Sequence, residues 1–335
     1  MNRTRGAVLA GLMLPLLLAG CGSADAGDSA ASSSAAEGSS AFPITIEHAY
    51  GETEIPQEPQ RVVSLGYTEQ DAILAFGVVP VGVRYAFGPE DDVFFPWADD
   101  AAGDAEPVIL PRAEIDAEQV AVLEPDLIMA VTAGLTEAEY ETLSGIAPVV
   151  VQPAQFPAFG TPWQDQTLVT GRALGQEERA EELVAEVEAR FADVRAAHAE
   201  LEGRSVTLSG VAYQGEYPFH ASSDTRTQFF LDFGMVVDPE LDEIAGEEFY
   251  GTVSQEQAGL LDADVLLWQA GSAAERAQIE GDPILGAIPA VAEGRSLFVE
   301  GADYDALQFS SVLSLPYLLD SLVPKISEVV QASGA

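Results

Sequence analysis

The alternation of short apolar strands with helical segments is the feature that most constrains how this chain folds. Residues 61–65 are a β-branched run that ends at Gly66, and residues 68–76 continue as a helix capped by Gly77. Continuous apolar strands separated by helices are typical of a parallel sheet covered on both faces, so we expect an α/β fold. The further predicted strands are 80–84, 126–131, 147–151, 205–213, 235–238, 264–268 and 296–299, and the further predicted helices are 114–123 and 225–233.

The segment 164–201 departs from this alternation, because it is one long helical stretch that Gly171 and Gly175 interrupt early. After these glycines, apolar residues recur at helical spacing between Glu and Arg. Such a helix can span two lobes or lie on the surface as an ordinary amphipathic helix, and periodicity alone does not choose. The length of 335 residues, 47% of them hydrophobic, favours two lobes. The apolar positions are Ala180, Leu183, Val184, Val187, Phe191 and Val194.

Residues 1–20 are typical of an export signal. Arg3 and Arg5 give a cationic start, and the apolar stretch 7–19 is too short to span a bilayer but suits the central region of a signal peptide. Small residues then precede Cys21, the only cysteine of the chain. This pattern resembles the lipobox of bacterial lipoproteins, in which diacylglycerol is attached to the thiol and the chain is cut before it.

Lipidation of Cys21 implies a protein that is exported and anchored to the outer face of the cytoplasmic membrane. Residues 21–42, rich in Ser, Ala, Gly and acid, cannot bury a core and are predicted to be a flexible tether. The alternative is a free thiol in a simple export signal. With Cys21 lipidated no disulfide is possible, so stability has to come from packing.

The acidity of the chain excludes several classes of function. Its formal net charge is −41, which repels nucleic acid and anionic lipid headgroups. The three histidines, His48, His198 and His220, fall in separate segments, so we predict no directly bound metal. No nucleophile elbow, phosphate-binding loop or zinc-protease motif occurs, and we predict no catalytic activity.

Five segments of the sequence stand out: residues 58–83, 116–130, 140–151, 170–184 and 253–268. In this order they resemble the helix-linked substrate-binding lipoproteins of iron-siderophore and cobalamin ABC importers. This resemblance covers most of residues 58–335 and implies two Rossmann-like lobes bridged by one long helix, with the ligand between them. It implies an N-terminal lobe at 43–163, a connecting segment at 164–201 and a C-terminal lobe at 202–335. It also implies ABC permease and ATPase subunits as partners, and we expect a monomer.

The same family carries one acidic docking position in each lobe, which meets arginines on the permease. The matching positions here are Glu118, seven residues before Pro125, and Glu256. Both lie at expected helix starts, where the helix dipole also favours a carboxylate. Helix capping is therefore the alternative role for both residues.

Candidate ligand-binding residues follow from the rule that ligands of open α/β sheets lie beyond the carboxyl ends of strands. A ferric siderophore presents oxygens around the metal, which guanidinium groups match, and an organic remainder that aromatic rings cover. The alternative role for each aromatic residue is packing between sheet and helix. With loop aromatics and arginines included, the candidates are Tyr67, Arg84, Tyr85, Trp97, Arg112, Tyr213, Tyr217, Arg226 and Trp268.

The shortage of cations favours a neutral chelate. Three hydroxamates neutralise ferric iron, whereas three catecholates leave a triply negative complex that needs a dense cationic basin. We therefore predict a ferric siderophore of the hydroxamate type, such as a ferrioxamine, and no permanent cofactor. Cobalamin and haem stay open as ligands, with Tyr67 or Tyr217 as an axial ligand of haem. A surface sensor or adhesion lipoprotein on the same fold is a further alternative.

Overall fold

The first lobe is built on a fully parallel sheet with the strand order β5-β4-β3-β6-β7. The structure is a computed structural model that describes residues 41–86 and 93–333. The predicted export signal, Cys21 and residues 21–40 of the predicted tether lie outside the described residues and stay predictions. The strands are β3 (Val62–Ser64), β4 (Gly82–Arg84), β5 (Val108–Leu110), β6 (Leu127–Ala130) and β7 (Val149–Val151).

Helices cover this sheet, and a hairpin precedes it in the chain. The sequence predicted four of the five strands, because β3, β4, β6 and β7 are apolar runs that lie within the predicted ranges. The hairpin and β5 are additional elements. The hairpin consists of the antiparallel strands β1 (Ile44–His48) and β2 (Gly51–Ile55), and the helices are α1 (Glu69–Ala75), α2 (Asp99–Ala102), α3 (Ala117–Val122) and α4 (Glu137–Ser144).

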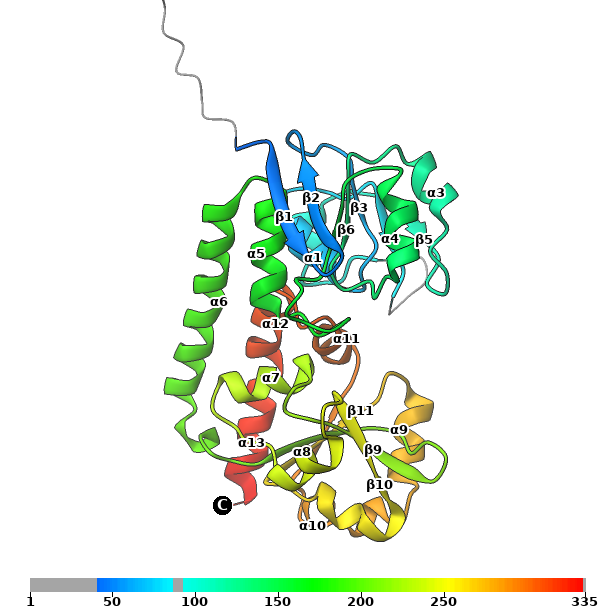
Figure 1. Cartoon of the computed structure of the whole chain (residues 1–335). Helices are drawn as coiled ribbons and strands as arrows, with labels where there is room; N and C mark the ends of the chain where they lie inside the picture. Colours follow the sequence, from blue (N-terminus) through cyan, green and yellow to red (C-terminus); the bar gives the residue numbers. More distant parts are fainter. Residues whose placement is uncertain (1–40, 87–92, 334–335) are drawn as a thin grey trace, which may run out of the picture. The chain divides into compact units, whose positions relative to one another are not determined.

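The connecting segment consists of two helices with a break between them. Helix α5 (Trp163–Ala173) packs against α1 and β1, while α6 (Glu177–Ala197) packs against α5 and against α12 near the C-terminus. Gly175, with φ of +72°, stands between them in a left-handed conformation that glycine adopts without strain. The short turn η1 (Ala199–Leu201) follows. Figure 1 shows α6 running alongside both lobes.

The second lobe holds a mixed sheet with the order β10-β9-β8-β11-β12. Its parallel part consists of β8, β11 and β12, whereas β9 and β10 are antiparallel additions at one edge. The predicted strand at 235–238 is wrong, because only a single bridge joins Val236 to Ser205 and Asp238 already caps the next helix. The strands are β8 (Val206–Ser209), β9 (Glu216–His220), β10 (Tyr250–Ser254), β11 (Val265–Gln269) and β12 (Ser296–Val299).

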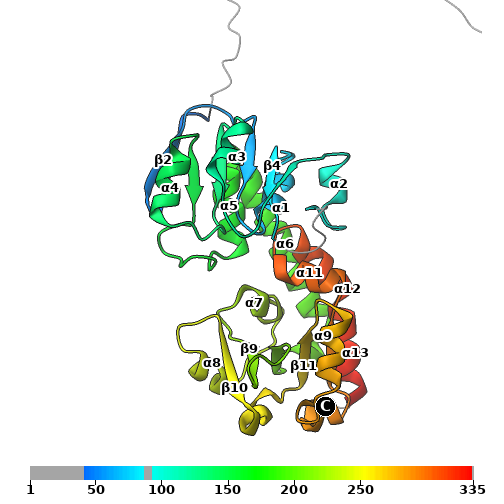
Figure 2. The same cartoon turned by 90° about the vertical axis from the view of Figure 1, so that its right-hand side faces the viewer.

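Most helices of the second lobe pack around this sheet, and α11 and α12 lie at the level where the two lobes meet (Figure 2). In the part of the chain that the structure describes, no helix combines the length and apolarity needed to cross a membrane. The elements are α7 (Thr225–Asp232), α8 (Pro239–Ala245), η2 (Gln255–Leu261), α9 (Ala273–Glu280), η3 (Leu285–Ala287), α10 (Pro289–Ala292), α11 (Ala302–Phe309), α12 (Ser314–Ser321) and α13 (Val323–Ser333).

One cluster of buried apolar side chains extends from the first sheet through α5 and α6 to the second sheet. Phe191 of α6 meets Phe229 of α7 edge to face, with 5.8 Å between the ring centroids. Because this core is continuous, close-packed side chains join the two lobes rather than an open strand linker. The predicted α/β fold, two Rossmann-like lobes joined by a long helix, is confirmed.

Candidate functional site

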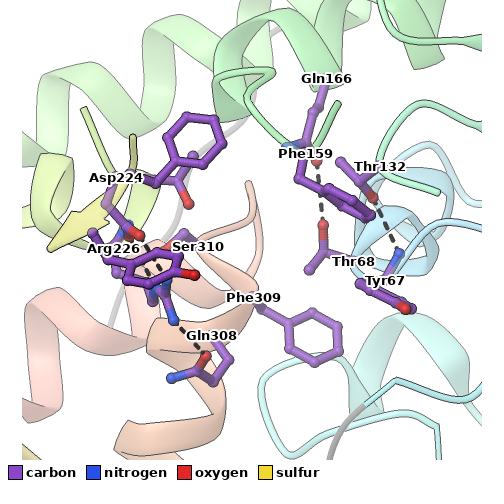
Figure 3. Close-up of a pocket in the computed structure, with 13 residues that line it drawn as sticks. Tyr67, Thr68, Thr132, Phe159, Gln166, Asp224, Arg226, Gln308, Phe309 and Ser310 are labelled. Atoms are coloured by element: carbon purple, nitrogen blue, oxygen red, sulfur yellow. Dashed lines mark hydrogen bonds and ion pairs between the residues drawn. The ribbon is translucent and has the colours of Figure 1, made fainter. Parts of the chain in front are cut away.

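A pocket of about 290 Å³ lies between the two lobes. One side comes from residues that follow β3 and β6 and from the loop before α5, so it lies at the carboxyl ends of parallel strands, as expected for this class of sheet. The other side comes from the start of α7, the start of β10 and the end of α11 (Figure 3). The lining residues are Tyr67, Thr68, Thr132, Phe159, Gln166, Asp224, Thr225, Arg226, Phe249, Tyr250, Gln308, Phe309 and Ser310.

Arg226 is held against Asp224 by a two-pronged ion pair. Its Nε and Nη2 atoms donate to the two carboxylate oxygens at 2.8 and 2.6 Å, and its Nη1 atom donates to Gln308 Oε1 at 3.1 Å. Asp224 also caps α7, because its carboxylate accepts the backbone N–H of Arg226 at 2.9 Å. The guanidinium is therefore fixed in direction before any ligand arrives.

Asp224 remains ionised in this setting. Burial by itself raises the pKa of Asp224, but the hydrogen bonds from Arg226 and His220 outweigh burial and hold the pKa well below its usual range. Burial lowers the pKa of His220, although Asp224 at 3.1 Å partly opposes this. Among the lining residues that the structure describes, the charged side chains are thus one cation, Arg226, and one anion, Asp224.

A buried carboxyl group fixes the two loops on the opposite side. Glu69 accepts the backbone N–H groups of Gly66 at 2.8 Å and Thr132 at 2.6 Å, and Thr132 Oγ1 accepts the N–H of Tyr67 at 3.1 Å. Burial raises the pKa of Glu69 to about 7. A Cβ on Gly66 would lie 2.3 Å from the Glu69 carboxyl, so only glycine fits at that position. These contacts set where Tyr67 and Thr132 face the pocket.

Arg84 does not line this pocket, but it contacts Tyr67, which does. The residue is 7% exposed, and its guanidinium donates to the carbonyl oxygens of Arg112 at 2.7 Å and Ala133 at 3.4 Å. It also lies 4.8 Å from the ring centroid of Tyr67. Since its donors face backbone carbonyls and its charge lies beside a ring, Arg84 positions Tyr67.

An aromatic joint links the lobes beside the pocket. Trp97 stacks on Phe95 at 4.8 Å between centroids and meets Phe309 edge to face at 5.3 Å. Its Nε1 atom donates to Asp71 Oδ2 at 2.7 Å, and the hydroxyl of Ser311 donates to the same oxygen. Asp71 of α1 thereby connects the first lobe to the segment that follows α11.

The structure brings two of the nine predicted ligand residues, Tyr67 and Arg226, into the lining of the pocket. Tyr217 and Trp268 are instead core residues, at 0% and 1% exposure, and Tyr217 donates its hydroxyl proton to Asp282. The physical reason is that both lie inside strands, β9 and β11, and not just after them. The lining does not include Arg84, Tyr85, Trp97, Arg112 or Tyr213.

Several lining residues were not predicted from the sequence. Phe159 is an aromatic residue in a loop, which is the same feature that singled out Trp97. Asp224 stands just before a predicted helix, where a capping role was recognisable. Gln308 and Phe309 lie at the end of α11, a helix that the sequence analysis did not predict.

The two predicted docking residues are exposed, and they lie in different lobes. Asp116, not Glu118, caps α3, because its carboxylate accepts the N–H groups of Glu118 at 2.9 Å and Gln119 at 3.3 Å. Glu256 lies in the first turn of η2. Within residues 41–86 and 93–333, no group of three or more His, Cys, Asp or Glu side chains is arranged to hold a metal ion.

Comparison with known proteins gives a consistent set of similarities. A family model described as periplasmic binding protein matches residues 63–299. The probable siderophore-binding lipoprotein YfiY of Bacillus subtilis (strain 168) is 26% identical over 272 residues, which cover 77% of this chain and 76% of YfiY.

Two solved structures extend these similarities. A periplasmic solute-binding protein from Mycobacterium smegmatis is 36% identical with a TM-score of 0.78, and the match covers 86% of this chain and 98% of that one. PiaA of Streptococcus pneumoniae TIGR4, in complex with ferrichrome, is 27% identical with a TM-score of 0.74, and the match covers 86% and 99%.

Proposed function

The chain belongs to the periplasmic binding protein family, and on this premise we propose that it captures a ferric siderophore between its lobes for an ABC importer. The observation that carries the proposal is the pocket, in which Arg226 and Tyr67 face one space from different lobes. Guanidinium donors and aromatic rings suit the oxygens and the organic surface of such a chelate. The name of YfiY and the bound ferrichrome of PiaA support the same class of ligand.

The two lobes and their connection have separate roles in this proposal. Residues 43–163 and 202–335 are the ligand-binding lobes, and 164–201 is the connecting segment. The continuous core along α6 supports a modest closure on ligand binding, in contrast to proteins whose lobes turn on flexible strands. Tyr67 and Arg226 contact the chelate, and Arg84, Tyr85, Trp97, Arg112 and Tyr213 remain proposed contributors around it.

The charge of the lining supports a neutral chelate of the hydroxamate type. Asp224 already compensates Arg226, and Arg84 is turned toward backbone carbonyls. A triply negative catecholate complex would enter this pocket without matching positive charge, inside a chain of formal net charge −41. A ferric trihydroxamate carries no charge at its metal centre and avoids that cost.

The remaining parts of the proposal concern location and partners. The chain is exported, lipidated at Cys21 and held at the outer face of the cytoplasmic membrane as a monomer. It delivers its chelate to an ABC permease and ATPase, and Glu118 and Glu256 dock it on the permease. It has no permanent cofactor and no catalytic activity.

Titration of the purified protein with a panel of ligands tests the chelate class. Ferrioxamine B is expected to quench the tryptophan fluorescence saturably, because Trp97 lies against Phe309 of the pocket lining. Iron-free chelator is the control for quenching that does not depend on the ferric complex. Replacing Arg226 with Gln should weaken binding about tenfold or more, since a charge-assisted hydrogen bond contributes roughly 1.5–3 kcal/mol. Saturable binding of ferric catecholates alone, a Soret band with haem, or binding of cobalamin alone would each contradict the hydroxamate proposal.

A further inference from the structure

Phe159 has a backbone conformation that its residue type rarely adopts. It lies in the loop between β7 and α5 with φ of +63°, in the left-handed region, where a bulky side chain is an outlier. Its side chain is not deeply buried, because the residue is 46% exposed. Core packing therefore does not account for the strained backbone. Strain of this kind is concentrated at ligand sites and switch regions.

Contacts with Tyr67 and Gly134 fix the position of the Phe159 ring in the lining of the pocket. It stacks on Tyr67 with 5.7 Å between the centroids and 14° between the ring planes. It also lies on Gly134: a Cβ added there would stand 2.2 Å from Cζ and 2.6 Å from Cε2 of Phe159. The missing side chain at Gly134 is what lets the ring lie flat against the first lobe. Figure 3 shows Phe159 beside Tyr67 and Thr132 on that side of the pocket.

The pocket is small, so the ring of Phe159 in its lining affects which ligands fit. Its volume of about 290 Å³ lies just below the roughly 300–1,000 Å³ range of small-molecule sites. An aromatic ring is among the largest single contributions that one residue makes to such a lining. The ring of Phe159 stands on a loop and is half exposed, so its removal enlarges the pocket without opening the core.

We propose that Phe159, seated on Gly134 and stacked on Tyr67, is a specificity-determining residue that sets the bulk of the chelate that the pocket accepts. This inference rests on the proposed function, since it concerns the ferric chelate bound at the same site. The aromatic face contacts the organic part of a compact chelate and excludes a bulkier one. Gly134 contributes to the same selectivity, because any side chain at this position displaces the Phe159 ring toward the ligand.

The test uses two probes with the same iron coordination and the same charge. Both are ferrioxamine B acylated at its free amine, one with an acetyl group and one with a bulky adamantane-carbonyl group. The intact protein should bind the acetyl form more tightly. Phe159→Ala should shift the ratio of the two affinities toward the bulky form by at least about tenfold, the range over which small changes of pocket volume discriminate ligands.

A double-mutant cycle tests the contact between the Phe159 ring and Gly134. Gly134→Ala alone should weaken binding of the acetyl form about tenfold, whereas Gly134→Ala added to Phe159→Ala should cost little, because the colliding ring is gone. Gly246→Ala is the control for backbone strain: its φ of +64° is close to that of Gly134 at +63°, but no atom lies within 4 Å of an added Cβ. It should leave both affinities unchanged, and equal losses in the control would show that backbone strain alone explains the Gly134 variant.

The outcomes separate the inference from the function beneath it. If the intact protein binds both probes and Phe159→Ala leaves their ratio unchanged, the specificity role is wrong and the proposed function stands. If the intact protein binds neither probe, the hydroxamate function fails and the inference falls with it. If Gly134→Ala does not fold, the ratio measured with Phe159→Ala alone still decides.

Discussion

A chain that carries Glu118→Arg together with Glu256→Arg is expected to bind ferrioxamine B with unchanged affinity and to support no measurable uptake. Both carboxylates are exposed, one in each lobe, and neither lines the pocket. Neither one forms an ion pair or hydrogen bond with another described residue, so each is available to a partner. Like charges brought together at an interface cost several kcal/mol, which corresponds to a loss of uptake of roughly a hundredfold or more.

A matched pair of reversals separates docking from the general effect of charge. Glu137 in α4 and Glu243 in α8 are also exposed and also lie one in each lobe. Glu137→Arg with Glu243→Arg changes the net charge by the same amount and should leave uptake close to that of the unaltered protein. Each single reversal at Glu118 or Glu256 should reduce uptake partially. The docking assignment is wrong if the double reversal transports normally, or if the control pair loses as much.

The docking role of Glu118 and Glu256 comes from the sequence resemblance and stays a prediction, and the structure adds that both residues are exposed. The structure adds one distinction that the sequence left open. Asp116 accepts the N-terminal N–H groups of α3, and this relieves Glu118 of the capping role. Asp116 and Glu118 both suit the start of a helix in the sequence, and only the hydrogen bonds identify Asp116 as the capping residue.

Four strands of the first sheet, β3, β4, β6 and β7, were predictable because they are continuous apolar runs buried on both faces, whereas β5, with Val108 exposed, was not predicted. The edge hairpin of β9 and β10 was not predicted either. β9 contains Pro218, which cannot donate to a ladder and normally argues against a strand. The fold tolerates it: β9 pairs with β8 only at Ser209 and Phe219, and the hydroxyl of Ser209 donates to the Pro218 carbonyl at 2.7 Å.

The residues of the candidate site were predictable only where they directly follow a strand or begin a helix. The rule of strand ends found Tyr67, and the start of a helix marked Arg226. Trp268 is buried because β11 continues one residue beyond its predicted end, to Gln269, and Tyr217 is buried because it lies in β9, a strand that was not predicted. A local sequence pattern does not predict contacts between distant segments. Arg226 donates a hydrogen bond to Gln308 across 82 positions, and Ser311 donates one to Asp71 across 240.

The joint at Asp71 is expected to make the protein progressively less stable as the pH rises from about 4 to about 7. The residue is 1% exposed, and burial raises the pKa of Asp71 from 3.8 to about 7, although the hydrogen bonds from Ser311 and Trp97 oppose this. The folded state therefore holds the proton more tightly than the unfolded state. Protonated Asp71 therefore makes its full contribution to the free energy of unfolding below pH 4. This contribution is lost as the pH approaches 7, by about 4 kcal/mol in total.

Asp71→Asn removes this titration and keeps the geometry, because the amide oxygen accepts the same two hydrogen bonds. The melting temperature of the variant relative to the unaltered protein should rise by about 5–10 °C between pH 4 and pH 8. Glu69, with a pKa raised to about 7, and Asp232, with a pKa raised to about 6, titrate in both proteins and cancel in the comparison. Parallel melting curves across this pH range would contradict the assignment.

Ser311→Ala gives an independent check on the same carboxyl. It removes one of the hydrogen bonds that lower the pKa of Asp71, so the pH range over which stability is lost should move upward. It leaves Trp97 as a donor, and the joint should still form. Ser311 directly follows Ser310 and Phe309 of the pocket lining, so ligand affinity measured at pH 6 and pH 8 reports whether ionisation of Asp71 is transmitted to the pocket. A stability shift without a change in affinity would confine its role to holding the lobes together.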